Sequence, residues 1–145
     1  NLGKLVPLLD RRIEQVRRAT GAEQVVLIAH SMGGLVCRSY LARFGSEHVE
    51  RLITIASPHS GSKIAHIGIG ANAREMEPGS LWLKDLASED VPVRAISIRT
   101  PHDNFVMPQD NQRLPGAIDV ALDGIGHIAV LFSRRTTREL VAACR

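Results

Sequence analysis

Apolar residues near the start of the chain recur at every third or fourth position, with charged residues between them. This spacing brings the apolar residues onto one side of a helix and predicts a helix from about Lys4 to Thr20, which Gly21 ends. We expect this side of the helix to pack against the rest of the chain. Its apolar positions are Leu5, Leu9, Ile13 and Val16.

Short apolar runs farther along the chain are typical of buried strands, and they alternate with segments of helical length. This alternation predicts a parallel sheet with helices on both faces, which is an α/β fold of the three-layer, Rossmann-like kind. Parallel strands are covered on both faces, so we expect the apolar run 25–29 to be buried. The expected strands are 25–29, 51–56, 93–98 and 117–122, and the expected helices are 33–44 and 135–144, the last with Leu140 and Val141 facing inward.

The first strand runs without a break into a turn of small residues, and a helix follows at once. Ser31 is at the centre of this turn, with Ala29 two positions before it and Gly33 two positions after it. Strand and helix backbones pass close together at such a turn, so both positions need small residues. The pattern favours a nucleophile elbow, in which the serine hydroxyl points out above the sheet, although an alanine replaces the usual first glycine. The alternative is an ordinary turn in which Ser31 caps the helix.

Length and composition are those of one globular domain spanning residues 1–145, with 44% hydrophobic and 23% charged residues. The net charge of +3 does not indicate a nucleic-acid partner, because the arginines cluster on two expected helices without aromatic residues to stack bases. Cys37 and Cys144 cannot form a disulfide framework, and no histidine or acidic cluster has metal-ligand spacing. We therefore expect no metal, no cofactor and no nucleic acid. No apolar run reaches transmembrane length.

A serine hydroxyl is a weak nucleophile until a base removes its proton, and the base needs an acid to hold its tautomer. After a serine elbow, the acid and then the histidine are expected along the chain. Asp103 comes just after the third expected strand and His127 just after the fourth, so both would reach the rim of the sheet where Ser31 lies. We expect Ser31 as nucleophile, Asp103 as acid and His127 as base. The alternatives weighed are His30, His48, His59, His66 and His102 for the base, and Asp110, Asp119 and Asp123 for the acid.

Four segments resemble, in order, the motifs of bacterial lipases and related esterases of the α/β-hydrolase superfamily. Residues 29–34 (AHSMGG) resemble their elbow, and residues 57–62 (SPHSGS) resemble the segment after their next strand. Residues 103–108 (DNFVMP) resemble their acid loop, and residues 126–128 (GHI) resemble their histidine loop. The resemblance implies a triacylglycerol-lipase type of enzyme of lipid metabolism. Such an enzyme cleaves carboxylic esters through an acyl-enzyme, and its partner is an ester or lipid substrate.

The resemblance also implies an oxyanion hole built from backbone N–H groups. One donor is the amide of Met32, but no His-Gly pair precedes Ser31 to mark the second donor, which we expect to be absent from this chain. We therefore expect the first strands of the fold to be missing, and an N-terminal segment or a partner chain to complete the sheet beside 25–29. The loss of one donor costs about a hundred- to a thousandfold in rate, so residues 1–145 alone should be weakly active at best. The chain does not begin with Met, and the sequence assigns it to no compartment, with secretion and membrane association both open.

The stretch 57–90 is interrupted by several Pro and Gly residues but is rich in apolar side chains. Similar enzymes often insert a lid or cap there, and for 81–86 a crossover helix packed on the sheet is an equal alternative. For substrate binding the sequence predicts His30, Leu81 and Trp82, and a membrane or lipid interface is a further expected partner. Two other functions stay open: a thioesterase or acyltransferase on the same fold, and a non-catalytic binding domain.

Overall fold

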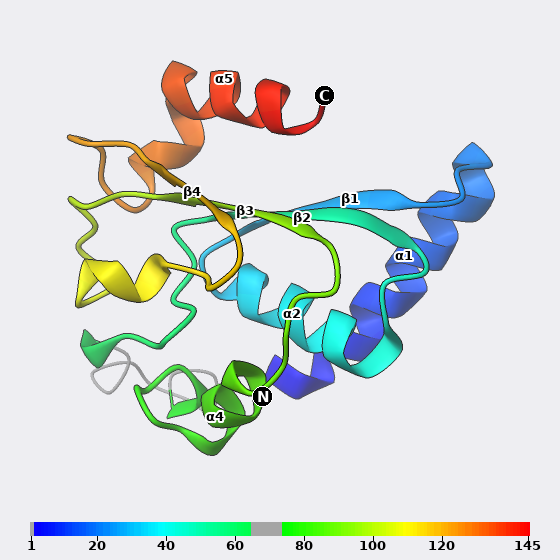
Figure 1. Ribbon diagram of the computed structural model, residues 1–145, viewed down its shortest axis with the longest axis horizontal. Coiled ribbons are helices and arrows are strands. Elements are labelled where there is room, and N and C mark those ends of the chain that lie inside the picture. Colours follow the sequence, from blue (N-terminus) through cyan, green and yellow to red (C-terminus); the bar gives the residue numbers. More distant parts are fainter. Residues whose placement is uncertain (1, 65–73) are drawn as a thin grey trace.

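A parallel sheet of four strands, in the order β1-β2-β3-β4, forms the centre of the molecule. The structure is a computed structural model and describes residues 2–64 and 74–145. α2 and α4 lie on one side of the sheet and α5 on the other (Figure 1). The strands are β1 (Val25–His30), β2 (Val49–Ile55), β3 (Arg94–Arg99) and β4 (Ile118–Ala121), and the helices are α1 (Val6–Thr20), α2 (Met32–Phe44), α4 (Leu81–Ala87) and α5 (Arg134–Ala143). Short 3-10 turns span Leu2–Lys4, Gln109–Gln112 and Ala129–Phe132.

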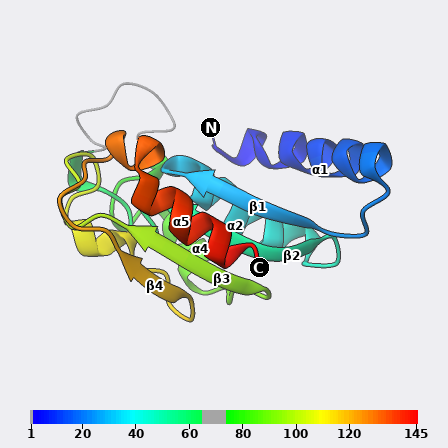
Figure 2. The same cartoon turned by 90° about the horizontal axis from the view of Figure 1, so that it is seen from above.

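The predicted three-layer α/β architecture is confirmed. Every neighbouring pair of strands is parallel, and each predicted strand and helix is present with ends that differ by one or two residues. Seen from above, α5 lies over the strands (Figure 2). The differences at the ends have a local cause: at the start of the chain, for example, the 3-10 turn Leu2–Lys4 precedes α1.

Two side chains predicted to face inward are exposed instead. Val16, at the end of the apolar side of α1, has 38% of its surface exposed, whereas Ile13 is buried. Val141 in α5 is 49% exposed, whereas its neighbour Leu140 packs against the core. Consecutive residues of a helix point about 100° apart, and here Leu140 faces the sheet while Val141 turns toward solvent. Thr136, one turn before Leu140 on the same side of the helix, is buried as well.

β1 lies at an edge of the sheet, and in the part of the chain that the structure describes it is not buried on both faces, although the sequence predicted that it would be. It pairs with β2 along its length, from Val25 with Val49 to His30 with Ile55. Leu27 is buried under the α1–α2 layer, but Ile28 on the opposite face of the strand is 50% exposed. An apolar edge strand of this kind invites pairing with a further strand.

α4 is the crossover helix between the parallel strands β2 and β3. Ser80 caps it, because its hydroxyl accepts a hydrogen bond from the amide of Leu83. Leu83 and Leu86 are both buried and pack against Leu35 of α2, so the helix rests on α2 rather than on the sheet. Within the expected lid 57–90, residues 65–73 lie outside the described residues. The lid stays a prediction.

The close approach of α2 to β2 falls on Gly34 rather than on Gly33. A Cβ atom at Gly34 would lie 2.3 Å from Ser57 Oγ and 2.7 Å from Ser57 Cβ, which is too close. A Cβ atom at Gly33 would lie 3.6 Å from the Ala29 Cβ, which is an ordinary contact. Small residues were predicted two positions before and after Ser31, and Ala29 and Gly33 do lie next to each other, but the position at which a Cβ atom does not fit is Gly34.

Replacing Gly34 with alanine should consequently destabilise the fold. We expect Gly34→Ala to lower the free energy of unfolding by about 1–3 kcal/mol, because the added methyl group overpacks the contact with Ser57. Gly33→Ala is the matched control, since alanine there favours the helix and fits the available space. Urea unfolding of both variants measures the difference. Equal stabilities of the two variants would contradict the steric account.

Candidate active site

The elbow is a strained turn between β1 and α2. Ser31 has φ +53° and ψ −129°, a left-handed conformation that is rare for residues other than glycine. Its amide donates to the carbonyl oxygen of Ile55 at 2.9 Å, which ties the turn to the end of β2. The Ser31 side chain makes no capping hydrogen bond to α2, so the alternative that it serves as a helix cap is wrong. Strain of this size costs about 1–3 kcal/mol and persists where surrounding contacts enforce it.

The structure brings the side chains of Ser31, His127 and Asp103 into one chain of hydrogen bonds. His127 Nε2 lies 3.0 Å from Ser31 Oγ, and His127 Nδ1 lies 2.7 Å from Asp103 Oδ2. A carboxylate only accepts, so the Nδ1 nitrogen of His127 donates to it and Nε2 is left to accept from the serine hydroxyl. His127 and Asp103 are both buried, at 4% and 2% exposure.

The three side chains come together because each lies just after the end of a strand. Ser31 follows β1, Asp103 lies in the loop after β3, and His127 lies in the loop after β4. The arrowheads of β1, β3 and β4 point to the same side of the sheet in Figure 2. Parallel strands deliver the residues after their carboxyl ends to one rim, which is where α/β proteins bind ligands.

The Asp103 carboxylate is held in its ionised form. Burial alone would raise the pKa of Asp103, but the hydrogen bonds from His127, Val106 and Phe105 outweigh it and lower the pKa below its ordinary value. The amides of Phe105 and Val106 donate to Asp103 Oδ1 at 2.7 and 2.8 Å, while Oδ2 accepts from His127. The side-chain amide of Gln109 donates to the Asp103 carbonyl oxygen at 2.9 Å and closes the acid loop. Asp103 is therefore charged at neutral pH.

Met32 is the first residue of α2. The first N–H groups of a helix have no acceptor within the helix, and the helix dipole gives that end partial positive charge. The Met32 amide is thus suited to stabilise a negative oxygen next to Ser31.

Apart from His30, the alternative histidines and acids that the structure describes make their contacts outside the group of Ser31, His127 and Asp103. His59 Nε2 lies 3.0 Å from Thr54 Oγ1, and His102 Nδ1 accepts from the Gly124 amide at 2.9 Å. The alternative acids Asp110 and Asp119 both pair with Arg113, and Asp119 also pairs with Arg99. His48 lies 3.7 Å from Glu14, Arg135 bonds to the backbone of Asp123, and His66 lies outside the described residues.

The structure separates the three residues predicted to bind substrate. His30 reaches the group of Ser31, His127 and Asp103, because its Nε2 atom lies 2.9 Å from the carbonyl oxygen of His127. Trp82 instead lines a hollow of about 300 Å³ together with Ser39 and Arg43, on later turns of α2. Leu81 is 79% exposed on α4.

Sequence reasoning missed one contact of the site. The ring of Phe105 lies 5.1 Å from the ring of His127, centroid to centroid, and 54% of the Phe105 surface is exposed. The position of Phe105, two residues after Asp103, is the sequence feature that could have indicated this contact. Sequence reasoning also missed a buried charge in α2: the Arg38 guanidinium donates to the carbonyl oxygens of His59 and Leu86, and burial lowers its pKa. An arginine in a helix gives no sequence signal of burial.

Within residues 2–64 and 74–145, no group of three or more His, Cys, Asp or Glu side chains is arranged to hold a metal ion. No helix in the same part of the chain is long and apolar enough to cross a bilayer. The thiol of Cys37 is buried in the core, which raises its pKa to about 12.

Comparisons with known proteins agree with this architecture. A family model described as the alpha/beta hydrolase fold matches residues 7–76. A triacylglycerol lipase of Pseudarthrobacter phenanthrenivorans is 47% identical over 53 residues, which cover 37% of this chain and 16% of the lipase. A triacylglycerol lipase of Pseudomonas fragi is 37% identical over 57 residues, covering 39% of this chain and 19% of the lipase. The matched stretches of this chain thus cover less than a fifth of the length of these relatives.

Solved structures resemble almost the whole chain. A Bacillus licheniformis lipase in its mature form superposes with a TM-score of 0.85 at 16% identity, covering 99% of this chain and 74% of that protein. A monoacylglycerol lipase of Paleococcus ferrophilus superposes with a TM-score of 0.62 at 14% identity, covering 99% and 73%. At such low identity, these likenesses establish the fold.

Proposed function

We propose that this chain, which has the α/β-hydrolase fold, carries the nucleophile, base and acid of a serine esterase of the lipase type. The observation that carries the proposal is the continuous hydrogen-bonded chain from Ser31 through His127 to Asp103. The strained turn at Ser31 supports it, because strain in a serine elbow keeps the hydroxyl exposed to substrate.

In the proposed acylation step, Ser31 Oγ attacks the carbonyl carbon of the ester while His127 Nε2 takes the hydroxyl proton. Asp103 stays ionised and stabilises the imidazolium of His127. The Met32 amide donates to the oxygen of the tetrahedral intermediate. His127 then gives its proton to the leaving alcohol, and an acyl group remains on Ser31.

Deacylation repeats these steps with water as the nucleophile. His127 removes a proton from the water, the tetrahedral intermediate forms again beside the Met32 amide, and collapse releases the carboxylic acid. The proton returns to Ser31 Oγ, so the site is restored after each turnover.

A second oxyanion donor is also part of the proposal. Among the described residues, no strand pairs with the outer edge of β1, and Ile28 is half-exposed; both observations support a further strand in this place, supplied by an upstream segment or by a partner chain. A loop at the end of such a strand would lie beside the elbow and could carry the second N–H group.

The proposed substrates are carboxylic esters with apolar acyl chains, lipids among them. The curated relatives are named triacylglycerol lipases, and that name supports this substrate class. The surroundings of His127 support it too, because Phe105 beside it and Ile128 after it each expose about half of their apolar surface.

Turnover of short- and long-chain p-nitrophenyl esters by the natural protein tests the proposal. We expect hydrolysis with a burst of nitrophenol as the acyl-enzyme accumulates. Residues 1–145 expressed alone should turn over the same esters about a hundred- to a thousandfold more slowly, because one oxyanion donor is then lacking. Full activity of residues 1–145 as a monomer would contradict the proposal that the second oxyanion donor comes from outside these residues. Product analysis with added alcohols and thiols distinguishes a hydrolase from an acyltransferase or thioesterase on the same site.

A further inference from the structure

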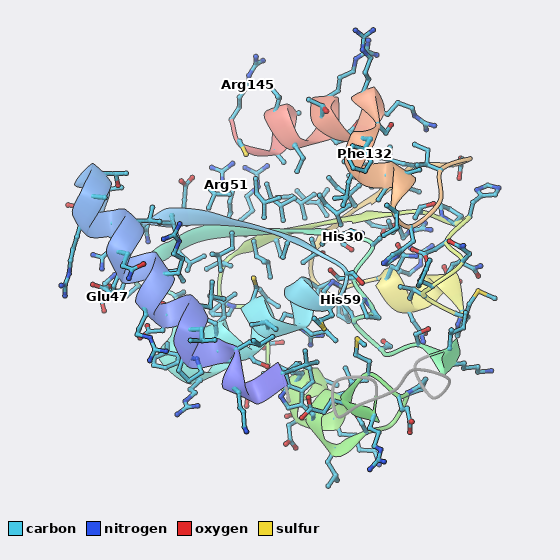
Figure 3. All side chains as sticks on the ribbon, turned by 180° about the vertical axis from the view of Figure 1, so that it is seen from behind. His30, Glu47, Arg51, His59, Phe132 and Arg145 are labelled. Atoms are coloured by element: carbon cyan, nitrogen blue, oxygen red, sulfur yellow. The ribbon has the colours of Figure 1, made fainter. Side chains whose placement is uncertain are left out.

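His30 directly precedes Ser31, yet its side chain is bonded to the backbone of His127. The His30 Nε2 atom lies 2.9 Å from the His127 carbonyl oxygen, and the two ring centroids are 4.7 Å apart. A carbonyl oxygen only accepts, so His30 donates this hydrogen bond and carries a proton on Nε2. Figure 3 shows His30 at the end of β1.

The loop that carries His127, residues 122–128, is bonded to other side chains at Asp123, Gly124 and Ile125, but His30 is the residue that bonds to the His127 carbonyl itself. The loop contains Gly126 and also Gly124, which has φ +74°, and the next regular turn begins only at Ala129. His30 belongs instead to a strand that is paired with β2, where His30 itself aligns with Ile55. A bond from this strand to the loop fixes the loop relative to the elbow.

We propose that His30 is a positioning residue whose Nε2–H group, by donating to the His127 carbonyl, keeps the His127 ring within reach of Ser31. This inference rests on the proposed ester hydrolysis. The His127 ring bonds to Asp103 at 2.7 Å and to Ser31 at 3.0 Å, and both distances depend on where the loop backbone lies. A displacement of about 1 Å can cost about a hundredfold in rate.

The charge state of His30 is compatible with this role. Burial lowers the pKa of His30 and outweighs the hydrogen bond to the His127 carbonyl, which raises it. The charge of His127 lowers the pKa further, and the charge of Asp103 raises it. His30 is therefore neutral at pH 7 and still donates from Nε2. A neutral His30 does not oppose the positive charge that His127 acquires when it takes the proton of Ser31.

Two substitutions of His30 separate the hydrogen bond from simple packing. His30→Gln keeps an N–H donor at the same number of bonds from Cα, whereas His30→Leu removes the donor. We expect His30→Leu to lower kcat for ester hydrolysis about 10- to 100-fold with little change in KM, and His30→Gln to recover most of that loss. His48→Leu is the matched control, because His48 lies near Glu14 and away from the site, and it should keep the parent kcat.

The measurements are kcat, KM and the melting temperature of the natural protein and its three variants. A His30→Leu variant with the parent kcat would overturn the inference. Equal loss of kcat in the Leu and Gln variants would overturn it as well, because a packing role gains nothing from the restored donor. A parent protein that hydrolyses no ester would overturn the proposed function itself, and this inference with it.

Discussion

Ser31→Ala is expected to lower kcat for ester hydrolysis by about a millionfold, the size of loss seen when the nucleophile of a serine hydrolase is removed. Alanine lacks the hydroxyl that lies 3.0 Å from His127 Nε2, so no acyl-enzyme can form. Steady-state turnover of a p-nitrophenyl ester by the natural protein and the variant measures the effect.

The control for this substitution is Ser60→Ala, at an exposed serine in the loop after β2. It should keep the parent kcat. A Ser31→Ala variant with more than a few per cent of the parent activity would show that another residue is the nucleophile.

Asp103→Asn is expected to lower kcat by about 10⁴-fold, because an asparagine amide can donate to His127 Nδ1 and so favour the wrong imidazole tautomer. It also removes the negative charge that stabilises the imidazolium. The side chain is fully buried against His127 and the amides of Phe105 and Val106, so water cannot substitute for the carboxylate. The rate of ester hydrolysis at neutral pH measures the loss.

Asp110→Asn makes the same chemical change at an acid that sequence reasoning left open. Its side chain is 76% exposed and pairs with Arg113 on the surface, so we expect the parent rate. Equal activity of the Asp103 and Asp110 variants would show that Asp103 is not the acid partner of His127.

The order of strands and helices could be predicted because it depends on local patterns. The apolar run of β1, the small residues around Ser31 and the polar turns after β3 and β4 all lie within short stretches of sequence. Parallel pairing then places the residues after three strands at one rim. The meeting of the strand ends therefore follows from the sequence order, whereas the choice of Asp103 and His127 over the alternative acids and histidines rests on the side-chain contacts.

Contacts between distant segments could not be predicted in this way. The bond from His30 to the His127 carbonyl joins residues 97 positions apart and depends on where a glycine-containing loop folds back. The need for glycine at position 34 rather than 33 depends on which side of α2 meets Ser57. The exposure of Ile28 depends on which other segments cover β1, and the sequence of β1 itself does not encode this.

The most direct measurement of the central claim is the site of covalent attachment of a fluorophosphonate. Fluorophosphonates react with an activated serine nucleophile and mimic its acylation. After labelling of the natural protein, peptide mass spectrometry should find one adduct, on Ser31, and Ser31→Ala should remain unlabelled. An adduct on any other residue, or no labelling of an intact and folded protein, would contradict the assignment of Ser31 as the nucleophile.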